Sequence, residues 1–176
     1  NPRPDPRHQI VHIYYPTPEA IDRVKRLGVM ANVQTVFIHF EGDAYVRFLG
    51  EKRGACVKPL KTSVSKGIAV GNSQDYPSGP VSAGIGLWAA VARETFEGKT
   101  LCPSERLTVQ EALRTYTIWA AKHLFMEGKI GSLELGKYAD LVVWDTDLYT
   151  APTERLKEIR AEMTMLNGEV VCVKDA

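Results

Sequence analysis

The sequence predicts an α/β protein with a parallel sheet followed by a small β unit. Apolar runs typical of buried strands occupy residues 7–15, 29–38 and 68–72, and they alternate with helical patterns. The last part of the chain instead shows strand patterns at 138–145 and 162–173. A chain of 176 residues can bury one sizeable core. Strands that alternate with helices favour a parallel sheet, open or closed, with ligand sites at the strands' C-terminal ends.

The first strand and helix follow from local signals. Apolar and aromatic residues crowd residues 7–15 between prolines, and their alternation places His12 and Tyr14 on one face. Thr17 can cap the helix that follows, and Gly28 can end it. This segment therefore predicts strand, helix and glycine stop in that order.

The same order returns in the next segment. We expect a strand over residues 29–38, a short helix from Asp43 to Gly50 and another helix over residues 59–67. A third strand over residues 68–72 then leads into a loop containing Asp75.

Two further helices and a hairpin follow the proline-rich loop. Residues 83–96 have a helical pattern, and Thr108 and Glu111 have the spacing of a capping box. The capped helix is expected to run to about Phe125. Near the C-terminus, the pair at 167–168 is Asn-Gly, the strongest short-range signal for a hairpin.

Composition argues against several partner classes. Lys and Arg total 22 and Asp and Glu total 21, with no charge run or arginine–aromatic pattern, so no nucleic-acid partner or anionic membrane surface is expected. No apolar stretch reaches the roughly 18 residues of a membrane helix. The start has neither Met nor a signal-peptide pattern, so we expect a piece of a longer protein. A neutral small molecule is the expected partner.

The cysteines predict a compartment rather than a site. Cys56, Cys102 and Cys172 are widely spaced and form no CxxC pair, which is typical neither of a disulfide framework nor of a cysteine metal site. We expect inert thiols in a reducing cytoplasm. No GxSxG elbow, glycine-rich phosphate loop or HExxH motif occurs.

Polar residues at the predicted strand ends are the candidates for chemistry. His12 follows the first strand, Gln34 and His39 follow the second, and Asp75 follows the third. A histidine and an aspartate at one mouth of a parallel sheet could bind a divalent metal, and the carboxylate could take a proton from metal-activated water. Gln34, His39 and Arg53 are candidate substrate contacts.

A structural interpretation of the same residues stays open at this point. His12 could be a hydrogen-bonded core histidine, and Asp75 could cap the turn at Pro77 through an Asx hydrogen bond. Gln34 would then be a solvated loop residue. Spacing does not decide between the two interpretations.

The order of several segments resembles a known family. RHQIVH, LGVMANVQ and GIAVGNSQDYPSGP are followed by a long segment ending in GSLELGKYADLVVWD and by MTMLNGEVV. This order is similar to the C-terminal part of the metal-dependent amidohydrolase superfamily, in its amidohydrolase family 3 branch. The likeness covers essentially the whole chain, and residues 131–145 are its most specific motif.

The resemblance implies a fold and a site. Residues 1–128 would form the C-terminal part, about three βα units, of a TIM-type (β/α)8 barrel, and residues 129–176 would contribute strands to a composite β-sandwich. His12 falls on the metal ligand of barrel strand six. Asp75 falls on the strand-eight aspartate, which in this family binds metal and acts as general base. The implied cofactor is one or two divalent ions, with zinc expected, and the implied substrate carries an amide-type C–N bond.

The chain lacks other ligands that the family uses. The HxH pair, the bridging lysine or acid and the strand-five histidine have no counterpart in these residues. Because catalytic zinc ordinarily has at least three protein ligands, we expect an incomplete site in this chain. Three strands cannot close a barrel, so self-association or pairing with a missing N-terminal half is expected. The alternatives are a non-catalytic half-barrel that oligomerises and a doubly wound binding module.

Overall fold

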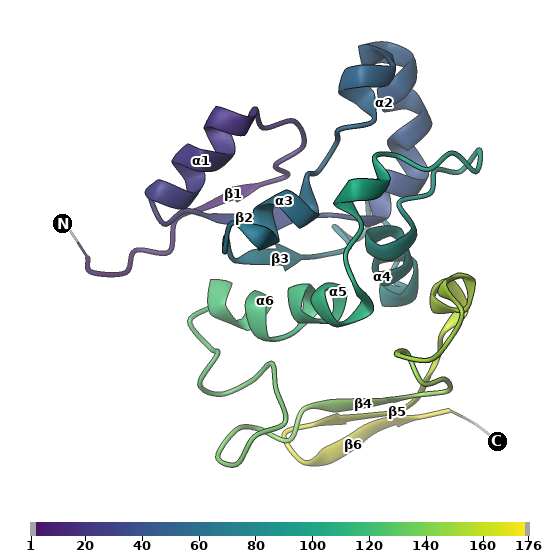
Figure 1. Cartoon of the computed structure of the whole chain (residues 1–176). Coiled ribbons are helices and arrows are strands. Elements are labelled where there is room, and N and C mark those ends of the chain that lie inside the picture. The colour runs from purple at the N-terminus through teal and green to yellow at the C-terminus, as the bar shows by residue number, and fades with distance from the viewer. Residues whose placement is uncertain (1–2, 175–176) are drawn as a thin grey trace.

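The computed structural model describes residues 3–174, and its first layer is a three-stranded parallel sheet (Figure 1). The strands are β1 (Gln9–Val11), β2 (Met30–Val33) and β3 (Val70–Asn72), in the order β1-β2-β3. Asn32 pairs with Val11 on one side and with Gly71 on the other. The C-terminal ends of all three strands therefore lie at one edge, as predicted.

Helices cover both faces of this sheet (Figure 1). The helices are α1 (Pro18–Arg26), α2 (Val36–Gly54), α3 (Leu60–Ser65), α4 (Ala83–Ala92), α5 (Val109–Tyr116) and α6 (Ile118–His123). Short 3-10 turns, η1 (Pro103–Glu105) and η2 (Thr153–Glu158), follow α4 and precede the last two strands. Val70 faces a small cavity shared with Leu60 of α3, whereas the opposite face at Gly71 abuts the His123 ring of α6.

The first strand and helix form largely as predicted. The Thr17 hydroxyl accepts a hydrogen bond from the backbone N–H of Ala20 at 3.2 Å, which satisfies one of the free donors of α1. Gly28 follows the helix with φ of 63°, a left-handed conformation that glycine adopts without steric cost. The strand is shorter than predicted, because His12 itself has φ of 57° and leaves the ladder after Val11.

The predicted strand over residues 29–38 was wrong in its second half. β2 ends at Val33, and Val36 already lies in α2. Asn72 fixes this turn: its side-chain oxygen accepts from the Thr35 backbone N–H at 3.1 Å and its amide donates to the Thr35 hydroxyl at 2.8 Å. α2 therefore begins at Val36, before the predicted start at Asp43, because burial in the tertiary structure outweighs the β propensity of its first residues.

Two helix ends also differ from the prediction. α4 stops at Ala92 rather than Phe96, because Arg93 turns left-handed with φ of 53° and its side chain binds carbonyls of distant loops. The helix from Thr108 does have the predicted capping box. It breaks at Thr117, where φ and ψ are −119° and −103°, so α5 and α6 replace one long helix.

The second sheet is antiparallel and lies beside the helical layer formed by α5 and α6 (Figure 1). It contains β4 (Leu141–Trp144), β5 (Ala161–Leu166) and β6 (Glu169–Val173) in that order. Asn167 and Gly168 join the last two strands with φ of 50° and 83°. Positive φ at both central residues is the pattern of the predicted tight hairpin, so this prediction is confirmed.

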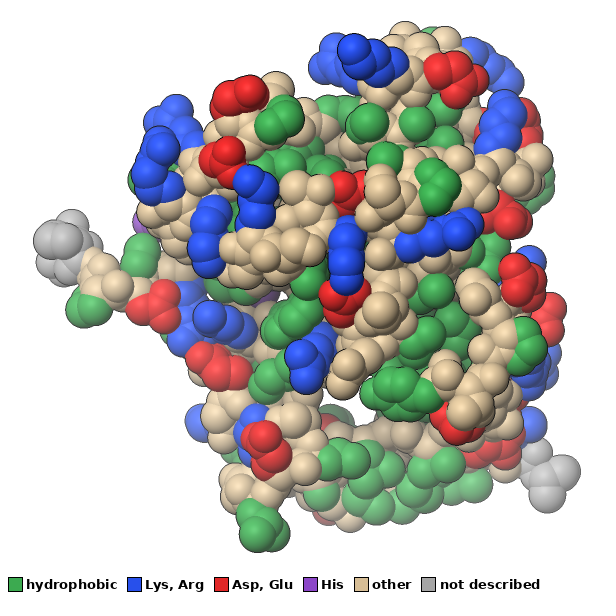
Figure 2. Space-filling model, in the orientation of Figure 1, with side chains coloured by type: hydrophobic (Ala, Val, Ile, Leu, Met, Phe, Trp, Pro, Cys, Tyr) green, Lys and Arg blue, Asp and Glu red, His purple; other side chains and the backbone are tan. Residues whose placement is uncertain are grey.

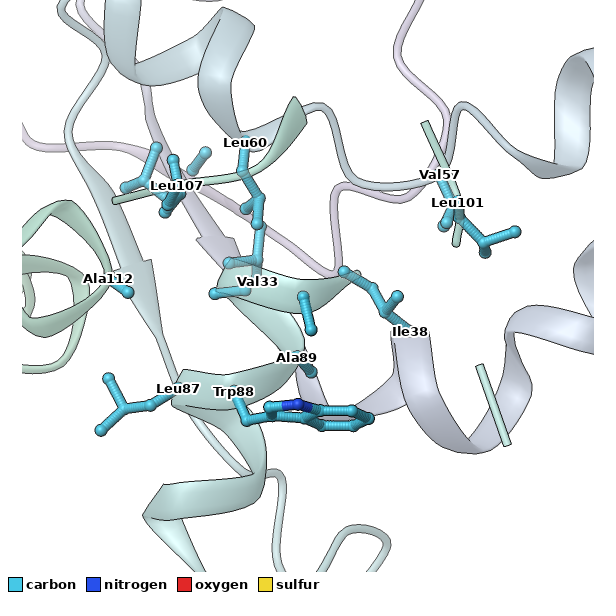
Figure 3. Packing of buried hydrophobic residues seen from close by; sticks show 14 of the residues in the cluster. Val33, Ile38, Val57, Leu60, Leu87, Trp88, Ala89, Leu101, Leu107 and Ala112 are labelled. Atoms are coloured by element: carbon cyan, nitrogen blue, oxygen red, sulfur yellow. The ribbon is translucent and has the colours of Figure 1, made fainter. Parts of the chain in front are cut away.

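The hydrophobic core lies between the parallel sheet and α2, α3 and α4 (Figure 3). Trp88 of α4 is 1% exposed and packs among Val33, Ile38 and Ala89. This core fixes the strands whose ends carry the candidate site. No helix within residues 3–174 has the length and apolar character needed to cross a membrane.

Candidate functional site

His12 and Asp75 lie together at the C-terminal edge of the parallel sheet. The Nε2 atom of His12 is 3.9 Å from an oxygen of the Asp75 carboxylate. His12 directly follows β1 and Asp75 lies three positions after β3, and both residues have a left-handed backbone, φ of 57° and 53°. Because the two strands are parallel and separated only by β2, their ends bring residues distant in sequence to one mouth.

The structural interpretation of these two residues fits the geometry poorly. Their side chains are 43% and 40% exposed, so His12 is no core histidine. The turn after Asp75 is closed by its backbone, because the Gly79 N–H donates to the Asp75 carbonyl oxygen at 3.1 Å. Within the described chain the Asp75 carboxylate contacts His12, and it is 40% exposed and so accessible to a ligand.

The pair has the chemistry and spacing of part of a metal site. An imidazole nitrogen and a carboxylate oxygen are common zinc ligands, with bonds of about 2.0–2.2 Å each. Ligands of a tetrahedral ion with such bonds lie roughly 3.4 Å apart, so the His12 and Asp75 atoms, now 3.9 Å apart, would have to approach slightly to share one ion. Among residues 3–174, no group of three or more His, Cys, Asp or Glu side chains is arranged around a common point. The described residues therefore offer two ligands.

Lys58 is a buried cation close to this pair. Its side chain is fully buried, and its ammonium nitrogen has no hydrogen-bond partner within the described chain. The nitrogen instead lies 3.1 Å from the centre of the Tyr14 ring, a cation–π contact. Burial lowers the pKa of Lys58 to about 7, although the nearby Glu41 and Asp75 carboxylates oppose this change.

The backbone of Lys58 is held from two sides. Its N–H donates to the Tyr14 carbonyl oxygen at 2.7 Å, and its own carbonyl oxygen accepts from Arg93 at 3.1 Å. Lys58 is left-handed, with φ of 49°, so the fixed backbone directs the side chain beneath Tyr14. The buried Arg93 guanidinium also donates to the Val57 and Leu101 carbonyl oxygens.

Three tyrosines, Tyr14, Tyr15 and Tyr45, form an aromatic cluster beside the pair, and Glu41 contacts this cluster. Burial raises the pKa of Glu41, and the Tyr45 hydroxyl donates a hydrogen bond to its carboxylate. The Tyr14 ring stacks on His12 at 6.0 Å and meets Tyr45 edge-on at 5.7 Å. Burial also raises the pKa of Tyr14 and Tyr15 to about 12, so both hydroxyls stay protonated at neutral pH.

Gln34 is buried, contrary to the solvated position considered for it. It is 2% exposed, and its side-chain amide donates to Asn32 at 2.8 Å and to the Ser73 hydroxyl at 3.0 Å. These bonds join the end of β2 to the residue that begins the loop of Asp75. Gln34 therefore helps to hold the loop of Asp75 in place through Ser73. Its side-chain oxygen has no hydrogen-bond partner within the described residues.

The contacts of His39 and Arg53 in the described structure are with residues other than His12 and Asp75. His39 is on α2, where its ring packs edge-on against Trp88 and its Nδ1 faces the Glu94 carbonyl oxygen at 3.2 Å. Arg53 is exposed near the end of α2, 5.8 Å from the centre of the Tyr15 ring. Their role as substrate contacts stays a prediction.

Sequence reasoning missed Lys58 and Glu41. Neither follows a strand, and each stands in a segment where a charged residue is ordinarily solvated. The signal that could have drawn attention to Lys58 is its place between Val57 and Pro59, in an apolar stretch leading into α3. Only the folded chain brings it beneath Tyr14.

Comparisons with known proteins identify the family of the chain. The model of the amidohydrolase family matches residues 1–172. The chain is 38% identical over 110 residues to an N-substituted formamide deformylase from Arthrobacter pascens, covering 62% of this chain and 20% of that protein.

Solved structures share the fold. An uncharacterized metal-dependent hydrolase from Pyrococcus horikoshii OT3 superposes with a TM-score of 0.71 and 28% identity, over 83% of this chain and 30% of that one. An adenosine deaminase from Xanthomonas campestris with bound zinc gives a TM-score of 0.68 at 18% identity, over 94% and 37% of the two chains. The chain thus spans between a fifth and somewhat over a third of the length of these proteins. By its match to the family model along nearly its whole length, the chain belongs to the amidohydrolase family, in the family 3 branch.

Proposed function

We propose that the protein containing this chain hydrolyses an amide-type C–N bond with metal-activated water. The observation that carries the proposal is the approach of His12 and Asp75 to 3.9 Å at the C-terminal edge of one parallel sheet. An imidazole and a carboxylate that are 43% and 40% exposed and, within residues 3–174, form no other ion pair suit a metal ion better than a structural ion pair. The deformylase relative, whose name specifies a formamide substrate, supports the reaction class.

Each residue has a distinct task in this reaction. His12 supplies a neutral nitrogen ligand, and Asp75 supplies a carboxylate oxygen. A divalent ion held by these two residues, with zinc expected, would polarise the carbonyl and lower the pKa of its bound water toward about 7. Asp75 then accepts the proton of the attacking water and passes it to the departing nitrogen. The loop between Asp75 and Gly79 restrains the carboxylate through its backbone hydrogen bond.

We further propose how the chain fits into the longer protein. β1, β2 and β3 would be strands six to eight of a (β/α)8 barrel, and β4–β6 would form the C-terminal part of a β-sandwich. Three parallel strands in sequential order fit a segment of such a barrel, although they would also fit one half of a doubly wound sheet, and the family match supports the barrel. The missing metal ligands and most substrate contacts would then come from the rest of the polypeptide.

The decisive experiment uses the full-length protein. The variants His12→Ala and Asp75→Asn are compared with His8→Ala, at the other end of β1, and with Asp22→Asn in α1, whose exposed carboxylate pairs with Lys66. Metal content is measured by mass spectrometry, and hydrolysis is measured on a panel of N-substituted formamides and simple amides.

The two site variants should lose metal or lose at least about 100-fold in activity, as expected for a ligand and a general base. The control variants should match the parent protein. If both site variants kept their metal and their hydrolysis, the assignment of His12 and Asp75 would be abandoned.

A second role, pairing with further polypeptide, is favoured by the open surfaces of this chain. Within residues 3–174, β1 and β3 each pair only with β2, so each has a free edge. Figure 2 shows hydrophobic side chains along the lower face, where the second sheet lies. Val142, Val143, Val170, Val171 and Val173 are 40–62% exposed there.

The partner is proposed to be the N-terminal part of the same protein or a second copy of this chain. The mass in solution is measured by light scattering for this chain, with and without the missing part. A stable monomer of the isolated chain, carrying stoichiometric metal, would contradict the half-barrel proposal.

A further inference from the structure

Two of the three cysteines lie on segments that are fastened together. Cys56 directly precedes Val57, and Cys102 directly follows Leu101. The buried Arg93 guanidinium donates to both neighbouring carbonyl oxygens, from Nη2 to Val57 at 2.6 Å and from Nε to Leu101 at 2.6 Å. Figure 3 shows the Val57 and Leu101 side chains next to each other. One side chain thus holds the two cysteine-bearing segments together.

A second clamp fixes the same segments a few residues further on. The Glu105 carboxylate accepts from the Thr62 backbone N–H at 2.9 Å and also from the Thr62 hydroxyl. Residues 56–62 and 102–105 are therefore held together near both ends, by Arg93 at one end and by the Thr62–Glu105 hydrogen bonds at the other. Cys56 and Cys102 are the first residues of these two segments. Relative motion of the segments is restricted, which favours a defined separation of the thiols.

Both thiols of the pair are accessible. Burial is the main cause of the raised pKa of the Cys56 thiol, and the neighbouring Cys102 adds to it. Cys56 is exposed in a groove that Pro59, Thr62 and Glu105 also line, and Cys102 is partly exposed. Cys172 lies far along the chain on β6 and is exposed on the second sheet. A small oxidant can therefore reach both thiols of the pair.

We propose that Cys56 and Cys102 are a peroxide-responsive dithiol that closes to a reversible disulfide. Hydrogen peroxide first oxidises one thiolate to a sulfenic acid and leaves as water or hydroxide. The other thiol then attacks that sulfur, the S–S bond forms and a second water departs, so two thiols and one peroxide yield one disulfide and two waters. A small dithiol reductant reverses the change.

The bond would tie the loop that carries Lys58 to the loop after α4. Arg93 already connects the two loops, because its guanidinium donates to the carbonyl oxygens of Lys58 in one loop and Leu101 in the other. The disulfide would close a long loop of the unfolded chain, so the oxidised protein should also unfold at a higher temperature.

The test is a peptide map of the native full chain after treatment with hydrogen peroxide. Trypsin releases Cys56 in the peptide 54–61, Cys102 in 100–106 and Cys172 in 161–174. A non-reducing digest should contain 54–61 linked to 100–106, and dithiothreitol should abolish it. Titration with a thiol reagent should show a loss of two of the three thiols.

Variants and a denatured sample provide the controls. Cys172→Ser should keep the cross-linked peptide, whereas Cys56→Ser and Cys102→Ser should each remove it. Peroxide added in concentrated urea should scramble the three possible pairings. Two outcomes would overturn the proposal: sulfinic acids at both cysteines without the linked peptide, or links to Cys172 at equal yield. Both can be read from the parent chain even if a variant fails to fold.

Discussion

Replacement of Lys58 by methionine should stabilise the fold at neutral and acidic pH. Methionine is unbranched like lysine, is one heavy atom shorter and removes the charge. The lysine ammonium is fully buried without a hydrogen-bond partner in the described chain. Its principal compensation is the cation–π contact with Tyr14 at 3.1 Å, along with the fields of Glu41 and Asp75.

The magnitude follows from the pKa. Burial lowers the pKa of Lys58 from 10.5 to about 7, which corresponds to about 4 kcal/mol of unfolding free energy at pH 7. Loss of the cation–π contact returns about 1–2 kcal/mol. The net gain for Lys58→Met is therefore about 2–3 kcal/mol, or about 5–10 °C in the melting temperature of a chain of this size.

The sign depends on pH in a defined way. Below about pH 7, lysine 58 is protonated in both states and the folded state carries the full cost. Between about 7 and 10.5, the unfolded chain holds a proton that the folded chain has released, so the stability of the parent rises with pH. The advantage of Lys58→Met should be largest and constant below pH 7 and should shrink above it.

Urea unfolding followed by tryptophan fluorescence at pH 6, 8 and 9.5 measures this advantage. Lys129→Met, at an exposed position, is the matched control and should match the parent within about 0.5 kcal/mol. The reasoning fails if Lys58→Met is less stable than the parent at pH 6, or if its advantage is unchanged at pH 9.5.

Three further changes test single features of the fold. Thr108→Ala removes the capping box of α5 and should cost about 1 kcal/mol in urea unfolding; an unchanged midpoint would argue against the cap. Arg93→Met leaves three buried carbonyl oxygens without their donor and should cost about 3 kcal/mol or more, whereas a loss below about 1 kcal/mol would mean that water replaces the guanidinium. Burial lowers the pKa of His123, so the unfolded chain binds its proton first as the pH falls below about 6.5, and stability is lost there. His123→Phe should remove that part of the acid sensitivity, and acid melting curves that keep the parent's slope would contradict this.

Local signals predicted those parts of the fold that depend on a few adjacent residues. The cap at Thr17, the capping box at Thr108 and the hairpin at 167–168 each involve contacts within about four positions. The ends of α4 and α5 could not be found in this way. Arg93 leaves the helix in order to bind carbonyls of loops near Val57 and Leu101, a reason that exists only in the folded chain.

In the candidate site, too, some positions could be predicted from the sequence and others depend on contacts formed only in the folded chain. His12 and Asp75 could be predicted to meet, because parallel strands place their C-terminal ends at one edge whatever the intervening sequence. The position of Lys58 could not, since it depends on the Tyr14 carbonyl and on Arg93. Gln34 was a candidate substrate contact, with a solvated loop position as the alternative, and the sequence does not reveal that its side chain is buried at the end of β2.

The position of Lys58 also makes a prediction about metal affinity in the full-length protein. A divalent ion between His12 and Asp75 and a proton on Lys58 carry like charge in the same region, so each should weaken the binding of the other. Burial has already brought the pKa of Lys58 to about 7, which places this competition within the physiological range. Zinc affinity should therefore rise from pH 6 to 8.5 more steeply in the parent than in Lys58→Met, as measured by competition with a chelator of known affinity. The rise that remains in the variant would reflect deprotonation of His12 and the other ligands. Identical pH profiles in the two proteins would mean that Lys58 is too far from the ion, or too well screened from it, to influence binding.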